Sequence, residues 1–159
     1  MTTMFQTSLN AIEIISCGST MDDFSREIDC FEYPRLRVLH DVDSSDPSRY
    51  DSDEPTGTLP IFRHVRTLVQ PIDDGQHFWR WTLEKCTLDR TPTQHWTRHW
   101  KPPKLQLLIF TTPRKKNYTI LSAKLVATLE SHGIRCRYIP GIKPNEILDL
   151  DLELNGPVE

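Results

Sequence analysis

The sequence lacks long apolar stretches, and its longest uninterrupted apolar run covers only residues 107–110. A helix that spans a bilayer needs about 20 predominantly apolar residues, so we expect no transmembrane segment. Residues 1–10 also lack the basic start and the apolar stretch of a secretory signal. We therefore expect a cytoplasmic or nuclear protein that is not secreted.

Signatures of catalysis and of cofactor binding are missing as well. The six glycines are scattered, and neither G-x-x-x-x-G-K nor G-x-G-x-x-G occurs, so no loop is expected to cradle a phosphate. His64, His77 and Cys86 could meet across a predicted hairpin, but no spacing requires a nucleophile and a base there. We therefore expect a protein that is not an enzyme and needs no cofactor.

No C-x-x-C pair occurs among the four cysteines, which are Cys17, Cys30, Cys86 and Cys136. Without a secretory signal, such isolated cysteines are expected to be reduced. His95 and His99 lie four residues apart and could join Cys86 and Cys136 as zinc ligands. Prolines crowd that segment and disfavour the helix that would place both imidazoles on one face, so we expect no metal site.

The net charge of −3 hides a strong partition along the chain. Residues 1–58 hold 4 Lys and Arg against 12 Asp and Glu, a net of −8. Residues 59–143 hold 15 against 5, a net of +10, and residues 144–159 hold none against 5, a net of −5. Such asymmetry concerns partners more than fold. Either the acidic parts fold back and neutralise the basic middle, or the basic middle meets a polyanion.

The chain is expected to form one domain preceded by a flexible segment. Residues 41–57 are rich in acidic side chains, contain two prolines and show no apolar periodicity, which is typical of a flexible connector. We predict an acidic, partly disordered arm and linker over residues 1–58. A basic α+β domain is expected over residues 59–154, with a short tail over residues 155–159.

Apolar patterning within that domain predicts strands and one helix. Val65 and Val69 suit an extended segment, and residues 73–75 suit a turn. Apolar and polar residues alternate over residues 78–88, so a hairpin is predicted. Residues 104–111 are expected to form a strand. Apolar positions spaced by three or four over residues 118–133 predict a helix that Gly133 ends.

Two further strands complete the predicted architecture. Residues 134–139 alternate directly after the helix, and Leu148, Leu150, Leu152 and Leu154 alternate with acidic residues as in a half-buried edge strand. The expected fold is therefore α+β, with a small, mostly antiparallel sheet and one covering helix.

The basic middle interleaves cations with aromatic rings. Cations contact phosphates and indoles stack on unpaired bases, so this mixture favours nucleic-acid binding, with single strands preferred. The alternative is that the tryptophans are buried and that the cationic side chains are ordinary solvent-exposed groups with no ligand. The predicted nucleic-acid-binding residues are Arg80, Trp96, Arg98, Trp100, Lys101, Lys104, Arg114, Lys115 and Lys116.

A short segment of the acidic arm carries two overlapping motifs. Residues 27–33 read EIDCFEY, which resembles the L-x-C-x-E segment by which viral regulatory proteins dock in retinoblastoma-type pockets. The resemblance implies that Ile28, Cys30 and Glu32 are the partner-binding anchors, with Ile in place of Leu. Residues 33–36 read YPRL and match the Y-P-x-L pattern that recruits ALIX-type budding machinery. An amphipathic helix turn is an alternative structure for the first motif.

These observations together predict a non-enzymatic protein that contacts nucleic acid through its basic domain. One alternative is a viral-type accessory adaptor whose acidic arm engages a host protein. Another is a virion structural, matrix-like protein, because anionic lipid also presents phosphate to Lys and Arg. An oligomer is compatible with each of these hypotheses.

Overall fold

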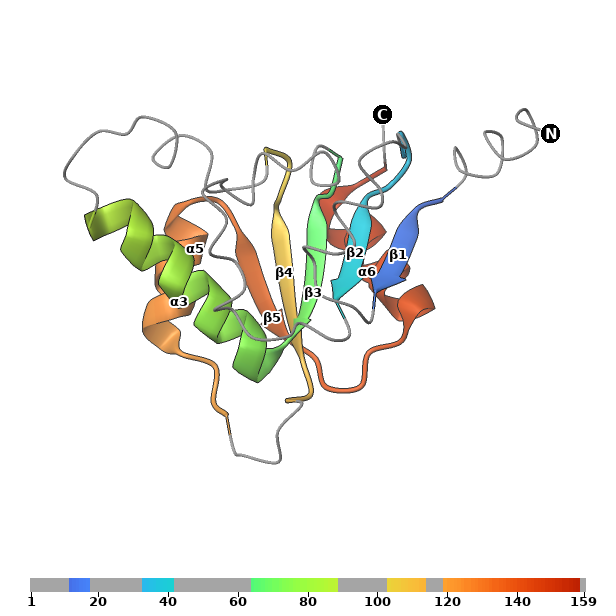
Figure 1. Ribbon diagram of the computed structural model, residues 1–159. Helices are drawn as coiled ribbons and strands as arrows, with labels where there is room; N and C mark the ends of the chain where they lie inside the picture. The colour runs from blue at the N-terminus through green and yellow to red at the C-terminus, as the bar shows by residue number, and fades with distance from the viewer. Residues whose placement is uncertain (1–11, 18–32, 42–63, 89–102, 114–118, 158–159) are drawn as a thin grey trace.

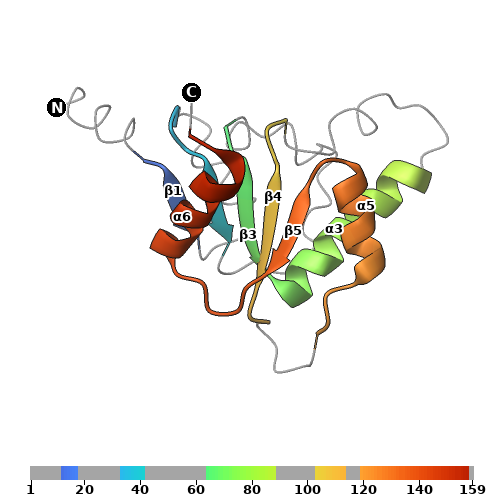
Figure 2. The same cartoon turned by 180° about the vertical axis from the view of Figure 1, so that it is seen from behind.

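The computed structural model describes residues 12–17, 33–41, 64–88, 103–113 and 119–157. These residues form a five-stranded sheet in the order β1-β2-β3-β4-β5, and all neighbouring strands are parallel. Helices α3 and α5 cover one face of the sheet, and α6 covers the other (Figures 1 and 2). The elements are β1 (Ile14–Cys17), β2 (Val38–Asp41), β3 (Thr67–Pro71), α3 (Ile72–Leu88), β4 (Leu107–Thr111), α5 (Ala123–Ser131), β5 (Arg135–Tyr138) and α6 (Pro144–Asn155).

The central strands β3 and β4 are apolar on both sides because both of their faces are covered. Leu68 and Leu108 are aligned in register and pack under α3 and α5. Val69 and Ile109 are the next aligned pair and pack under α6. The predicted strand at residues 104–111 is confirmed, and its uninterrupted apolar run reflects burial between two layers.

The predicted hairpin is wrong, because helix α3 takes the place of its second strand. Asp73 and Asp74 lie in the first turn of the helix, where carboxylates are favoured by the helix dipole, and do not form a tight turn. Trp79 is buried against the sheet, and its indole Nε1 donates a hydrogen bond to Gln70 Oε1 at 3.0 Å. Apolar and polar residues therefore alternate over residues 78–88 without forming a strand. The segment belongs to a helix, whose buried side chains recur at a period longer than two residues.

The predicted helix before Gly133 and the strand after it are confirmed as α5 and β5. Ser122 caps α5, since its hydroxyl oxygen accepts a hydrogen bond from the backbone N–H of Leu125 at 3.4 Å. Gly133 follows the C-cap with φ of 78°, a conformation that favours glycine. Leu125 and Leu129 form the buried face, as the spacing predicts.

Helix α6 lies where the alternating leucines predict an edge strand, so that prediction is wrong. Pro144 occupies the first turn, and the Glu146 carboxylate accepts a hydrogen bond from the Lys143 backbone N–H at 2.7 Å. Ile147 and Asp151, four residues apart, are the buried positions of the helix. A carboxylate on the inner face hides the helical period, because that face reads as polar in the sequence.

The predicted mostly antiparallel sheet with one covering helix is also wrong. Helices α3 and α5 each connect two neighbouring strands, and a strand that is reached through a crossover helix runs parallel to the one before it. Moreover, β1 and β2 come from the segment that the sequence analysis treats as an acidic arm. The sheet therefore begins well before residue 59.

No helix among the described residues is long and apolar enough to cross a bilayer.

Candidate functional site

The structure brings together few of the residues predicted to bind nucleic acid. Arg80 is exposed on α3 and borders a groove between α3 and α5 that Lys124 also lines. Lys104 is exposed just before β4 and lines a different cavity. Outside the described residues lie Trp96, Arg98, Trp100, Lys101, Arg114, Lys115 and Lys116, and also the partner-binding residues Ile28, Cys30 and Glu32.

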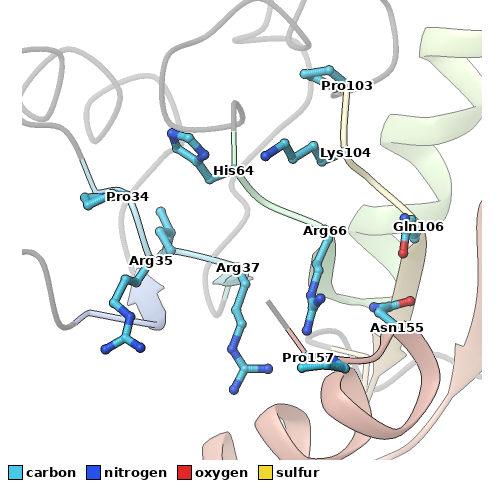
Figure 3. Close-up of a pocket in the computed structure, with 11 residues that line it drawn as sticks. Pro34, Arg35, Arg37, His64, Arg66, Pro103, Lys104, Gln106, Asn155 and Pro157 are labelled. Carbon is cyan, nitrogen blue, oxygen red and sulfur yellow. The ribbon is translucent and has the colours of Figure 1, made fainter. Parts of the chain in front are cut away.

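The cavity that contains Lys104 lies at the amino ends of β2, β3 and β4 and has a volume of about 500 Å³. We call it the amino-edge cavity (Figure 3). It is lined by Pro34, Arg35, Leu36, Arg37, His64, Arg66, Pro103, Lys104, Gln106, Asn155 and Pro157. Four of these residues are Arg or Lys, and none is Asp or Glu.

One sequence pattern, repeated before three strands, builds this cavity. The repeats are Arg35-Leu36-Arg37, His64-Val65-Arg66 and Lys104-Leu105-Gln106, directly before β2, β3 and β4. The strand register aligns the three repeats side by side. Their middle residues are buried in the core under α3 and α5. Their first residues are all exposed, so Arg35, His64 and Lys104 occupy a row of chain positions across the edge of the sheet. In Figure 3, His64 and Lys104 lie toward one side of this row and the Arg35 side chain points to the other.

Backbone hydrogen bonds repeat at these three strand starts. The Glu13 carbonyl accepts from the N–H groups of residues 37 and 38, both at 3.1 Å. The Arg37 carbonyl accepts from residues 66 and 67, both at 3.0 Å, and the Arg66 carbonyl from residues 106 and 107, at 2.9 and 3.0 Å. Each carbonyl therefore bonds two successive N–H groups of the next strand. This repeated geometry holds Arg37, Arg66 and Gln106 in a second row behind the exposed one.

A buried ion network under α6 fixes the inner side of the cavity. The fully buried Asp151 carboxylate pairs with Arg66, whose Nε and Nη2 donate at 3.0 and 2.8 Å to Oδ2. It also pairs with Arg37 Nη1. Thr67 Oγ1 and Asn155 Nδ2 donate to Oδ1 of the same carboxylate at 2.6 and 2.9 Å. One carboxylate of α6 therefore holds two guanidinium groups of the sheet.

The network keeps its members charged. Burial raises the pKa of Asp151, but hydrogen bonds from Arg66, Thr67, Asn155 and Arg37 outweigh burial and hold that pKa below its ordinary value. Burial lowers the pKa of Arg37, whereas Glu13 and Asp151 raise it, and the net shift is upward. The carboxylate and the guanidinium thus stay ionised at neutral pH.

The positive charge of the cavity is unevenly balanced. Arg37 also donates from Nη2 to the Glu13 carboxylate at 2.9 Å, so the guanidinium groups of Arg37 and Arg66 together face two carboxylates. Within the part of the chain that the structure describes, Arg35 and Lys104 have neither an ion pair nor a side-chain hydrogen bond. The inner row is therefore close to neutral, and the exposed row carries the excess charge.

The ion pair between Asp151 and Arg66 joins the acidic tail to the basic middle. One of the two alternatives for the basic middle is that acidic parts of the chain fold back and neutralise it. The pair of Asp151 with Arg66 does so for one carboxylate. Sequence reasoning found only Lys104 of the cavity. It missed Arg35, His64 and Arg66, although the repeated order of a basic residue, an aliphatic residue and a polar residue before an apolar strand is a usable signal.

Other titratable groups among the described residues do not form a comparable site. At the carboxyl ends of β1 and β2, Ser16 Oγ lies 3.3 Å from His40 Nδ1, and burial lowers the pKa of His40. Burial, followed by the nearby Glu130, raises the pKa of Cys136 to about 12, so the thiol stays protonated. His64 and His77 do not face each other across a hairpin, since β3 and α3 take its place.

Metal binding finds no support in the described part of the chain, where no three His, Cys, Asp or Glu side chains are grouped to hold an ion. His95 and His99, which could serve as zinc ligands by their spacing but were not predicted to do so, lie outside the described residues. In open parallel α/β sheets, ligands usually bind at the carboxyl ends of the strands, whereas the amino-edge cavity lies at the opposite end.

Comparison with protein-family models, with curated proteins and with solved structures finds no match for this chain. Since a fold by itself does not define an activity, the functional argument rests on the residues of the amino-edge cavity.

Proposed function

We propose that this protein binds nucleic acid, with single strands preferred, through the amino-edge cavity. The observation that carries the proposal is the exposed row of Arg35, His64 and Lys104, in a cavity where none of the described lining residues is acidic. Parallel strands lie about 4.8 Å apart, so this row spans about 10 Å across three strands. A phosphate backbone can place a negative charge against such a row.

The charge distribution of the whole chain supports a polyanionic ligand. Residues 59–143 have a net charge of +10, and only part of that excess is neutralised by the ion pair of Arg66 with Asp151. Lysine and arginine contacts to phosphate supply most of the affinity in sequence-independent nucleic-acid binding. The sign and the exposure of these side chains therefore support a polyanionic ligand.

The size of the cavity favours a single strand over a duplex. A volume of about 500 Å³ admits one nucleotide-sized group, whereas a rigid duplex can meet only the rim. A flexible single strand can direct one phosphate inward and leave its neighbours in solvent. The exposed Gln106 amide adds a neutral hydrogen-bonding group inside the cavity.

The test measures binding of the full chain to labelled single- and double-stranded RNA and DNA at several salt concentrations. A double variant, Arg35→Gln with Lys104→Gln, removes two exposed cations from the cavity. We expect weaker binding to all sequences. We also expect the logarithm of the binding constant to fall less steeply with the logarithm of the salt concentration. The slope should be shallower by about 1.4, because two phosphate contacts are lost and each contributes about 0.7 for single strands.

The matched control is Arg80→Gln with Lys124→Gln, which removes two exposed cations from the groove between α3 and α5. We expect this pair to leave affinity and slope unchanged. An equal loss in both double variants would contradict the cavity and favour a diffuse basic surface. Binding to phosphatidylserine vesicles without binding to nucleic acid would contradict the ligand class.

A further inference from the structure

We propose that the amino-edge cavity binds a phosphate monoester, either at the end of a nucleic-acid strand or on a free nucleotide. The inference rests on the proposed function for its longer ligand, since the same cavity would hold the strand end. A monoester differs from the internal phosphodiesters of a strand in its charge and in its number of free oxygen atoms.

The first argument is the unpaired positive charge of the cavity. Arg35 and Lys104 are exposed, belong to one cavity and have no carboxylate partner among the described residues. A phosphodiester carries one negative charge per nucleotide. A monoester carries about −1.5 to −2 at neutral pH and has three strong acceptor oxygens. Of the two, the monoester places more negative charge within a single small volume.

The second argument is a guanidinium group that is already held in position. Arg66 uses Nε and Nη2 to bond Asp151, and Nη2 also donates to the Gly156 carbonyl at 2.7 Å. Its remaining nitrogen, Nη1, makes no hydrogen bond to any residue that the structure describes. The side chain lines the cavity and is 12% exposed. A planar guanidinium fixed at one edge offers its other donors with little further loss of entropy.

The third argument is that the cavity is closed on its inner side. Leu36 and Arg37 are buried, and Asn155 is held by hydrogen bonds to Thr67 and Asp151. Pro34, Pro103 and Pro157 stand at its borders (Figure 3). Proline fixes φ at each of these three border positions. A cavity that ends on fixed residues suits the end of a ligand better than the middle of a strand.

The experiment compares one single-stranded oligonucleotide with a 5′-phosphate, a 3′-phosphate or hydroxyl groups at both ends, each bound to the full-length protein. We expect one phosphorylated end to bind about tenfold more tightly than the hydroxyl form, as for one added charge-assisted contact. A nucleoside monophosphate should compete for the site, and the corresponding nucleoside should not. Arg35→Gln with Lys104→Gln should abolish the preference, and Arg80→Gln with Lys124→Gln should retain it.

The possible results separate this inference from the proposed function. Tight binding of all three oligonucleotides with equal affinity would overturn the monoester site and leave nucleic-acid binding intact. Binding of the nucleoside monophosphate without binding of any oligonucleotide would support the monoester site and overturn the proposed function. Failure to bind any of these ligands would overturn both.

Discussion

The two faces of the sheet are held by different chemistry. Under α3 and α5, the core is a large cluster of buried apolar side chains, to which Gln70 and Trp79 add one hydrogen bond. Under α6, the buried apolar cluster is smaller and adjoins the network of Asp151 with two arginines. The first face is stabilised mainly by removal of apolar surface from water, whereas the second also depends on ionised groups.

That difference determines how each face responds to change. Apolar packing loses stability in proportion to the atoms removed and the cavity that remains. A buried ion pair adds little net stability because desolvation offsets most of the attraction, yet loss of one partner leaves the other charge buried and unpaired. The α6 face is therefore expected to tolerate the loss of exposed side chains and to lose much of its stability when the buried carboxylate of Asp151 is removed.

The largest expected effect is that of Asp151→Ala. The change leaves Arg37 and Arg66 without their shared carboxylate, so we expect the free energy of unfolding to fall by about 3–5 kcal/mol. Chemical denaturation monitored by circular dichroism measures the loss. Asp149→Ala, at an exposed position of the same helix, should change stability by no more than about 0.5 kcal/mol. Equal effects of the two variants would show that the network does not hold α6.

On the apolar face, Leu125→Ala is expected to cost about 2–5 kcal/mol. Leu125 is 4% exposed and packs in the core between α5 and the sheet. The matched variant is Leu152→Ala on α6, where the side chain is 42% exposed, and there we expect a much smaller loss. An unchanged melting temperature for Leu125→Ala would contradict the placement of α5.

Acid should weaken the α6 face selectively. The pKa of Asp151 is lowered in the folded state from its ordinary value of 3.8. The ionised carboxylate therefore makes its full contribution to the free energy of unfolding at pH values well above 3.8. The contribution is lost as the pH falls below 3.8 and through the lowered folded pKa. We expect the stability difference between the wild type and Asp151→Asn to narrow over this range in urea titrations. A difference that stays constant from pH 7 to pH 2 would rule out this ionisation as the cause.

The smallest expected effect concerns the close approach of α3 to the sheet. A Cβ added at Gly75 would lie 3.0 Å from Phe110 Cε1 and 3.1 Å from Gln70 Cβ. Phe110 and Gln70 belong to buried strands and have little room to shift. The cost of overpacking, about 1–3 kcal/mol, should exceed the gain of up to about 1 kcal/mol in helix propensity. Gly75→Ala should therefore lower the melting temperature slightly, and a rise would show that the layer can adjust.

Secondary structure was predictable where one physical rule acted alone. The run of β4, the spacing of Leu125 and Leu129, and Gly133 after α5 each follow from local sequence, and the structure confirms them. The predictions were wrong for α3 and α6, where two rules compete. Asp73 and Asp74 suit both a turn and a helix start, and Asp151 places a polar residue on a buried helical face.

The candidate site was less predictable than the secondary structure. Lys104 was found because it belongs to the basic middle of the chain. Arg35 was missed because it lies in a segment with a net charge of −8, and charge counted along the chain does not show which residues meet in space. Recognition of the row needs the knowledge that three strands are parallel and in register, which no single segment contains.

The sequence by itself determined the charge partition, the apolar strand β4 and the position of α5, because these depend on composition and on periodicity within one segment. Only the tertiary structure decided that the sheet is parallel and that α6 pairs Asp151 with Arg37 and Arg66. It also decided that Arg35, His64 and Lys104 share one edge. The physical reason is that burial, ion pairing and strand register are relations between segments distant in sequence, and their energies arise only when those segments meet.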